Sequence, residues 1–254
     1  MSAIGDGFEV RSLAVTLRHG AAFDWHRHPW GQLVYGASGV MSVATAAAAW
    51  LVPATRAIWL PAGLDHQIGF RGEVAMRTLY IAPTRAAALG EAPAVLEVAP
   101  LLREIILHIL KIGMLSPATP AQDRLTGLLI DLLSTARRQD LALPLPSDPR
   151  ALALARRLHA SPGDPTPLAD MARGHGASLR TLQRLFPRET GLTLEAWRQK
   201  ARLIHAAAAL SSGSSVTRAA FDCGYDSPGA FSAAFKRQFQ ATPGRYAQRS
   251  GTSR

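Results

Sequence analysis

The sequence predicts a two-domain α+β protein: an N-terminal β-barrel or jelly roll with flanking helices, and a C-terminal all-helical domain with two helix-turn-helix units. In the first 85 residues, turn-forming glycines and prolines recur about every ten residues between short apolar runs, as in all-β barrels and sandwiches. Leucines then recur at helical spacing, and after residue 150 one helical motif occurs twice. The expected divisions are a barrel over 1–90, helices over 91–138, a linker over 139–149 and the second domain over 150–254.

The positive charge of the chain is concentrated in its last part. The net charge of the 254 residues is +10, and residues 147–254 hold 16 Lys and Arg against 7 Asp and Glu. Residues 1–146 hold 12 against 11. A basic part joined to a nearly neutral part indicates that one domain meets a polyanion, with a solvated basic surface as the alternative.

The compartment is expected to be the cytoplasm. The N-terminus has no basic start followed by an apolar run, so we expect no signal peptide. No apolar run is long enough to span a membrane. The single cysteine, Cys223, cannot form an internal disulfide, which fits a reducing environment.

Two helices are expected between residues 95 and 138, separated by Pro117 and Pro120. In the second, five leucine positions recur at i, i+3, i+4, i+7 and i+8, which places them in one stripe. The stripe is formed by Leu125, Leu128, Leu129, Leu132 and Leu133. It can cover the barrel or face a second copy of the chain, so a homodimer is one of two open interpretations. Three prolines in residues 139–149 then predict an extended linker.

The C-terminal repeat pairs Ala172 and Gly176 with Ala220 and Gly224, at an offset of 48 residues. After the turn the offset becomes 49, and four residues recur. Ser178, Leu182, Phe186 and Trp197 recur as Ser227, Phe231, Phe235 and Tyr246. A small residue lets two helices approach, glycine permits the bend, serine caps the next helix and the apolar pair anchors it. Each copy therefore predicts a helix-turn-helix.

A helix over about 193–210 is expected to join the two copies. A stiff connector would fix the two reading helices relative to each other. They could then enter successive major grooves of double-stranded DNA, about 34 Å apart.

The same region resembles the DNA-binding domain of AraC/XylS regulators, over roughly residues 150–249. Segments 180–191 (RTLQRLFPRETG), 224–239 (GYDSPGAFSAAFKRQF) and 242–246 (TPGRY) carry the resemblance. It implies that the first reading helix contacts bases, and that both units contact DNA. The implied base readers are Arg180, Thr181, Gln183 and Arg184, and the implied further contacts are Arg188, Ser227, Ser232, Lys236 and Arg237. Arginine pairs well with guanine and glutamine with adenine, while Arg188, Lys236 and Arg237 suit phosphates.

Two features depart from that family. Pro187 stands late in the first reading helix, where we expect it to end or bend the helix. In the second reading helix, the positions expected to read bases hold side chains that cannot hydrogen-bond a base: Pro228, Gly229, Ala230 and Ala233. The second unit is therefore expected to contact mainly the DNA backbone and thymine methyl groups.

The N-terminal region resembles a cupin barrel over about residues 15–82, a type of sensor domain that AraC-family regulators often carry. Gly20-x5-His26-x-His28-x3-Gln32-x6-Gly39 has the spacing of the first cupin motif, and Pro61-x-Gly63-x2-His66 that of the second. Gln32, Thr55 and Phe70 replace residues usual in metal-binding cupins, where glutamate, glycine and asparagine stand.

Histidines two apart on a strand point to one face, so His26, His28 and His66 are expected to converge, with Gln32 or water as a fourth ligand. Imidazole suits Zn, Ni, Cu or Fe. A hydrogen-bonded pocket for an organic effector, or a site that no longer holds metal, is the open alternative. Five aromatic residues are candidates for the effector pocket or for plain core: Trp25, Trp30, Tyr35, Trp59 and Tyr80.

Together these features predict a sequence-specific DNA-binding transcriptional regulator that responds to a small-molecule or metal effector, and not an enzyme. One alternative is a metal-dependent cupin enzyme, such as an oxygenase or isomerase, fused to a DNA-binding domain. Gln32 argues against it, since iron oxygenases commonly need a carboxylate or a further histidine. The other alternative is a sequence-blind DNA binder, which would discriminate little between operator and random DNA.

Overall fold

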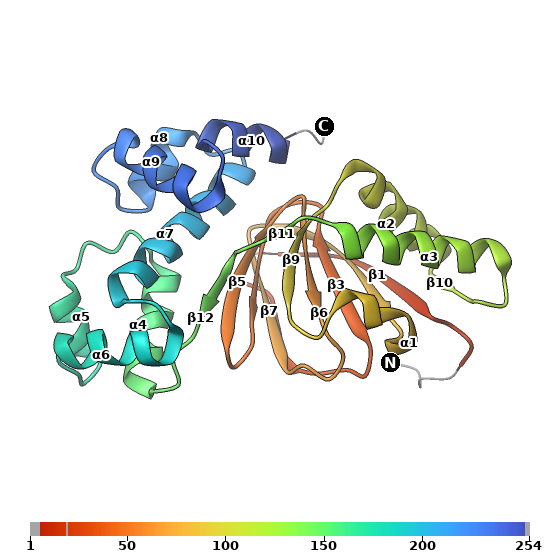
Figure 1. Ribbon diagram of the computed structural model, residues 1–254. Helices are drawn as coiled ribbons and strands as arrows, with labels where there is room; N and C mark the ends of the chain where they lie inside the picture. Colours follow the sequence, from red (N-terminus) through yellow and green to blue (C-terminus); the bar gives the residue numbers. More distant parts are fainter. Residues whose placement is uncertain (1–5, 19, 252–254) are drawn as a thin grey trace. The chain divides into compact units, whose positions relative to one another are not determined.

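The computed structural model describes residues 6–18 and 20–251, and it confirms the predicted pair of domains (Figure 1). One compact unit comprises the described residues up to Thr45 together with Val52–Leu141. The other comprises Ala46–Leu51 and the described residues from Ala142 onward. Strands dominate the first unit and helices the second, as the change of sequence pattern predicts.

The first unit is built from antiparallel strands in two sheets. The strand bounds in the first 81 residues are β1 (Val10–Leu17), β2 (Ala22–His26), β3 (Gly31–Gly36), β4 (Val40–Ala44), β5 (Ala48–Pro53), β6 (Arg56–Leu60), β7 (His66–Arg71) and β8 (Val74–Ile81). β9 (Ala94–Glu97), β10 (Met114–Leu115) and β11 (Arg138–Gln139) follow. The larger sheet has the order β10-β1-β8-β3-β6-β9-β11, and in the other sheet β7 pairs with β4 and β2.

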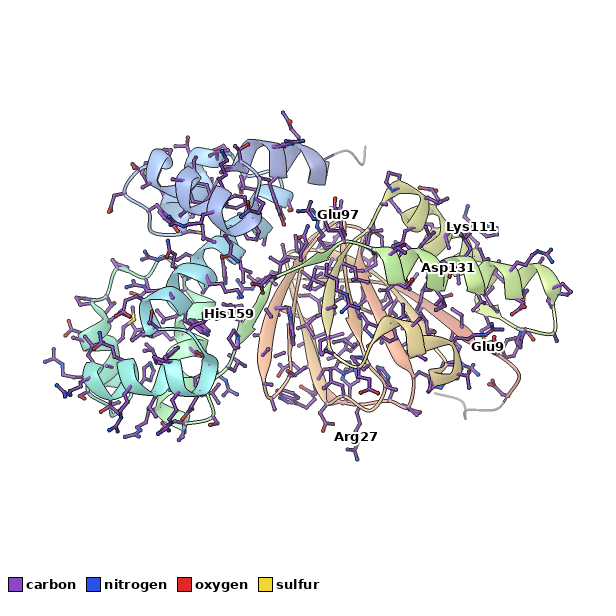
Figure 2. All side chains as sticks on the ribbon, in the orientation of Figure 1. Glu9, Arg27, Glu97, Lys111, Asp131 and His159 are labelled. Carbon is purple, nitrogen blue, oxygen red and sulfur yellow. The ribbon has the colours of Figure 1, made fainter. Side chains whose placement is uncertain are left out.

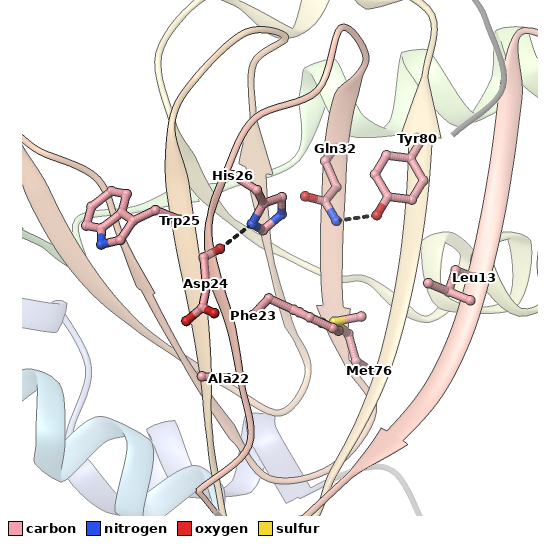
Figure 3. A pocket seen from close by; sticks show the side chains of 9 residues that line it. All are labelled: Leu13, Ala22, Phe23, Asp24, Trp25, His26, Gln32, Met76 and Tyr80. Atoms are coloured by element: carbon pink, nitrogen blue, oxygen red, sulfur yellow. Dashed lines mark hydrogen bonds between the residues drawn. The ribbon is translucent and has the colours of Figure 1, made fainter.

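Side-chain alternation divides the central strands of the larger sheet into two faces. Leu33 of β3 and Leu79 of β8 belong to a buried cluster that also contains helical residues such as Ile106 and Leu129. Gln32 and Tyr80, one position away, point to the opposite face, inside the barrel (Figure 3). The register pairs Gln32 with Tyr80 directly. The barrel interior therefore receives polar groups from two central strands.

Two helices cover the outer face of the larger sheet: α2 (Pro100–Ile112) and α3 (Pro120–Thr135). Leu129 and Leu133 of the predicted leucine stripe are buried in the barrel cluster, while Leu128 is 43% exposed. The stripe therefore serves mainly to cover the barrel. The charged side chains of Lys111 and Asp131 lie on the exposed side of these helices (Figure 2).

The region expected to be purely helical also contributes strands β9, β10 and part of β11. Val95 and Leu96 are buried because β9 extends the sheet beside β6, which is a tertiary contact that helical periodicity does not show. A short helix α1 (Pro83–Ala86) and a 3-10 turn η1 (Ala87–Leu89) precede it.

The second unit contains seven helices among its described residues. They are α4 (Pro149–Ala160), α5 (Leu168–Gly174), α6 (Leu179–Thr190), α7 (Leu194–Ser211), α8 (Val216–Asp222), α9 (Pro228–Phe239) and α10 (Pro243–Gly251). Helices α5–α6 and α8–α9 are the two predicted helix-turn-helix units, and α7 is the predicted connector. Gly176 and Gly224 have φ values of +71° and +75°, which only glycine adopts at little cost.

Part of the expected linker is ordered as strand. β11 contains Gln139, and β12 (Ala142–Pro144) pairs with β5. Proline is tolerated there because β12 stands at the end of its sheet, where one edge needs no partner. The Pro144 carbonyl also accepts a hydrogen bond of 2.7 Å from Trp197 Nε1 on α7.

No helix in the described part of the chain is both long and apolar enough to cross a membrane. Cys223 is buried, and burial raises the pKa of its thiol to about 12. The thiol therefore stays protonated at neutral pH, and a protonated thiol is a poor nucleophile.

Candidate functional site

The exposed face of α6 is set by the helix cap and by the apolar anchor. Ser178 Oγ accepts a hydrogen bond of 3.1 Å from the backbone N–H of Thr181, which fixes the start of the helix. Leu182 and Phe186, four positions apart, are fully buried. The remaining positions turn outward as a consequence. Exposed on this face are Arg180, Gln183, Arg184, Pro187 and Arg188, with Thr181 half-buried.

Pro187 does not end α6, so the first of the two expected effects, an end of the helix at this residue, was wrong. The helix continues to Thr190, and Gly191 closes it in the left-handed region with φ of 73°. A proline removes only the one N–H that would bond to Gln183, and its fixed φ is compatible with helix. The two residues that precede Pro187, Leu185 and Phe186, are buried and anchor the helix at this point.

Two carboxylates that the sequence analysis did not single out contact this region. Glu195 Oε1, in the first turn of α7, accepts a hydrogen bond of 3.0 Å from Gln183 Nε2. Glu189 accepts from the backbone N–H groups of Ser147 and Asp148, both at 2.9 Å, and pairs with Arg188 at 2.7 Å. The bond from the Asp148 N–H, followed by Arg188, lowers the pKa of Glu189 to about 2. The one sequence signal for Glu195 is an acidic residue in the first turn of a helix.

Helix α9 offers a different surface. Ser227 Oγ accepts from the backbone N–H of Ala230 at 3.2 Å, so the predicted cap is confirmed. Along the exposed face, Gly229, Ala230 and Ala233 carry no polar side-chain atom. The polar and basic side chains on this helix are the half-buried Ser232 and Gln238 and the exposed Lys236 and Arg237.

In the barrel, the histidines come together from different elements. His26 ends β2 and pairs in register with His66, the first residue of β7. His28 lies beyond the end of β2, so its expected place on the strand was wrong: the chain turns there toward β3, next to Pro29. One ring nitrogen from each histidine nevertheless lies within 4.8 Å of the other two.

Each of the three imidazole rings is held in a fixed orientation by a backbone carbonyl. Nδ1 of His26 lies 2.6 Å from the Asp24 carbonyl, Nδ1 of His28 lies 2.6 Å from that of Trp30, and Nδ1 of His66 lies 2.8 Å from that of Leu64. A carbonyl oxygen only accepts, so each Nδ1 carries the hydrogen in the neutral ring. Nε2 of each neutral ring therefore keeps a lone pair. Metal-binding histidines are oriented in this same way.

Gln32 faces His28 with an oxygen. Its Oε1 lies 3.0 Å from His28 Nε2, while its Nε2 donates to Thr78 Oγ1 at 3.1 Å and to Tyr80 Oη at 3.2 Å. Thr78 donates its own hydrogen to the Leu33 carbonyl, so it accepts from Gln32 and fixes the orientation of the amide. Gln32 Oε1 and Nε2 of the neutral His28 ring are then both hydrogen-bond acceptors. A cation bound to both atoms would stabilise this arrangement.

His66 is fully buried, and its Nε2 has no hydrogen-bond partner among the described residues. Burial, together with the neighbouring His26 and His28, lowers the pKa of His66 to about 4. The ring is therefore neutral at neutral pH, the state in which imidazole ligates metals.

The five aromatic candidates separate. Trp25 and Tyr80 line a cavity next to the histidines (Figure 3), whereas Trp30 and Tyr35 are buried, 1% exposed each. Trp59 is buried beside η1 and donates from Nε1 to the Gly90 carbonyl at 3.0 Å. Thr55, where cupins usually place glycine, keeps the left-handed backbone with φ of 69°.

Comparison with known proteins finds a DNA-binding family and a ligand-binding family in this chain. A helix-turn-helix domain family matches residues 171–249, and the AraC-like ligand binding domain family matches residues 15–178. The HTH-type transcriptional regulator NimR of Escherichia coli (strain K12) is 34% identical over 224 residues, covering 88% of this chain and 82% of NimR. RipA, an HTH-type transcriptional regulator from Corynebacterium glutamicum, is 37% identical over 100 residues, covering 39% of this chain and 30% of RipA. Among solved structures, ToxT from Vibrio cholerae O395 aligns over 96% of this chain and 99% of its own with 10% identity and a TM-score of 0.42.

Proposed function

The chain belongs to the AraC family of DNA-binding transcriptional regulators, and from this premise we propose how its two units divide the work. The second unit binds DNA, and the first is its ligand-binding domain. In our proposal, α6 reads bases, α9 holds the DNA backbone, and the barrel binds a metal-dependent effector in the cytoplasm. An effector acts only if it has different affinities for the DNA-competent and DNA-incompetent states.

The exposed face of α6 supports its role as the base-reading helix. Arg180, Gln183 and Arg184 are exposed together, and their side chains match guanine and adenine in the major groove. On α9 the matching face holds glycine and alanine, with Lys236 and Arg237 at its end. Basic side chains there suit phosphates, which position a protein without reading sequence.

Selection from randomised double-stranded DNA tests this division. We expect a bipartite site in which one half carries most of the sequence information, since α9 holds only glycine and alanine at the exposed positions where base readers are expected. Binding to the selected site should exceed binding to random DNA at the same salt concentration by 10³-fold or more. Equal information in both halves would contradict the division, and equal affinity for random DNA would favour the sequence-blind alternative.

We propose that His26, His28, His66 and Gln32 bind one divalent transition metal. The observation that carries this proposal is the buried, unpartnered Nε2 of His66 beside two further imidazole nitrogens. Gln32 Oε1, 3.0 Å from His28 Nε2, stands close to where a fourth ligand belongs, because two ligands with bonds of about 2.1 Å lie about 3.0–3.4 Å apart at angles between about 90° and 109°. Three imidazoles suit Zn, Ni, Cu or Fe, and the neutral amide lowers affinity relative to a carboxylate.

In this proposal the metal serves effector binding and not catalysis. The relatives compared are transcriptional regulators, and the helix-turn-helix pair has no part in an enzyme reaction. Turnover of a substrate by the metal-loaded protein would favour the enzyme alternative.

We further propose that a second copy of the chain packs on helices α2 and α3. Leu101 and Leu128 are large apolar side chains that are 57% and 43% exposed on these two helices. Analytical ultracentrifugation should show a dimer, and Leu128→Glu should shift it toward monomer because the introduced charge would be buried without a partner. Leu13→Glu, at an exposed leucine on β1, serves as the control and should leave the mass unchanged. A monomer for the unsubstituted protein would contradict the proposal.

A further inference from the structure

A cavity of about 460 Å³ lies between β1, β2, β3 and β8 of the first unit (Figure 3). Its volume is in the range of sites for small organic ligands. The residues that line it are Leu13, Ala22, Phe23, Asp24, Trp25, His26, Gln32, Met76 and Tyr80. His26 and Gln32 belong at the same time to the proposed metal site, so the cavity reaches the metal position.

The opening of this cavity is apolar. Leu13, Phe23 and Trp25 are 46%, 37% and 50% exposed. Large apolar side chains that stay exposed around a concave site indicate that something apolar binds there. Phe23 and Trp25 remain uncovered because β2 is the edge strand of its sheet, with no further strand beside it among the described residues.

A change of register between β2 and β7 directs two side chains of β2 into the cavity. Phe23 pairs with Ile68 and His26 with His66, so β2 has one extra residue between these pairs. A bulge of this kind re-aims side chains, and bulges are common beside functional sites. Phe23 and His26 both line the cavity as a result, with ring centroids 6.4 Å apart.

The polar side chains that line the cavity offer no positive charge to an anionic ligand. The lining contains no lysine or arginine, and its one carboxylate is Asp24. A carboxylate, thiolate or phenolate ligand would therefore meet no cationic side chain in the cavity, and an unpaired charge in such a place is unfavourable. The proposed metal would supply that missing positive charge.

We infer that the cavity binds a small, largely apolar molecule with one nitrogen or oxygen donor that completes the coordination of the metal. The apolar part lies against Phe23, Leu13 and Met76, and the donor atom reaches the metal beside His26. This inference rests on the proposed metal site and names the class of effector that the site accepts.

A pair of probes of matched shape tests the inference on the full-length protein loaded with Co²⁺. 4-Phenylimidazole carries a ligating nitrogen, whereas 2-phenylpyrrole has the same outline and no ligating lone pair. We expect 4-phenylimidazole to shift the visible d–d bands of Co²⁺ and to bind at least about tenfold more tightly than to metal-free protein. 2-Phenylpyrrole should leave the bands unchanged.

Two substitutions separate the apolar wall from the metal. Phe23→Ala removes part of the wall, and Leu13→Trp fills the cavity from the opposite strand. Both should retain Co²⁺ and weaken 4-phenylimidazole several-fold, while Phe221→Ala, at an exposed phenylalanine on α8 in the other unit, should change neither. If one variant fails to fold, the other provides the same test.

The possible outcomes distinguish a wrong ligand class from a wrong metal site. Co²⁺ bound in a histidine-dependent way, with bands that 4-phenylimidazole does not shift, would overturn the inference and leave the metal proposal in place. Equal affinity of 4-phenylimidazole for loaded and metal-free protein would do the same. Failure to take up Co²⁺ would overturn the metal proposal, and the inference with it.

Discussion

Replacing Arg184 with alanine is expected to weaken binding to the selected DNA site by about 1–3 kcal/mol and to relax specificity at one base pair. Arg184 is exposed in the middle of α6, where its guanidinium can donate two hydrogen bonds to one guanine. Because this contact is made only with guanine, the substitution should weaken binding only to DNA that carries guanine at that position. The measurement is a titration of the selected site and its single-base variants at fixed salt concentration.

Lys236→Ala provides the matched control on α9. Lys236 is exposed in the last turn of that helix, where a phosphate contact is expected. Its loss should weaken all sequences alike and lower the slope of log K against log salt by about one unit. If Arg184→Ala reduced binding to random DNA as much as to the selected site, its assignment as a base reader would be wrong.

Trp197→Ala is expected to destabilise the second unit by about 3–5 kcal/mol. The side chain is fully buried, its ring contacts Phe186 edge-on with centroids 5.8 Å apart, and its Nε1 donates to the Pro144 carbonyl at 2.7 Å. The substitution therefore leaves a large cavity and an unpaired carbonyl in one step. Urea unfolding followed by the helical circular dichroism signal gives the free energy of unfolding.

Two further variants at tryptophan positions show how much of this destabilisation comes from lost packing and how much from the lost hydrogen bond. Trp197→Phe keeps most of the packing and should cost about 1–3 kcal/mol, mainly for the unpaired Pro144 carbonyl. Trp25→Ala, at a tryptophan 50% exposed on β2, should cost less than about 0.5 kcal/mol. A loss below about 1 kcal/mol for Trp197→Ala would show that this side chain does not hold the unit together.

The helix-turn-helix pair could be predicted closely because its signals are local. Caps at Ser178 and Ser227, bends at Gly176 and Gly224, and apolar pairs four apart all depend on neighbouring residues, and the structure places them as the repeat predicts. Pro187 shows the limit of such rules: α6 continues to Thr190, anchored by the buried Leu185 and Phe186 that precede the proline.

The barrel site could be predicted only in its residue types. The spacing of the two motifs identifies the histidines, and the structure brings them together. The extra residue in β2 and the position of His28 beyond that strand follow from pairing with β7 and from the turn at Pro29, which are long-range or irregular features. For the same reason, Phe23 and Met76 gave no signal as cavity residues before the strands were placed side by side.

The metal content of the full-length protein, purified without chelator, shows whether the histidines of the barrel hold a metal. Elemental analysis should find close to one transition metal per chain, and the His26→Ala/His28→Ala double variant should lose it, because two of three imidazole ligands are removed. His159→Ala, a histidine on α4 in the other unit, serves as the matched control and should retain the metal. No metal in the unsubstituted protein, even after reconstitution with Zn, Ni, Cu or Fe, would contradict the account and leave the three histidines as the lining of a metal-free pocket.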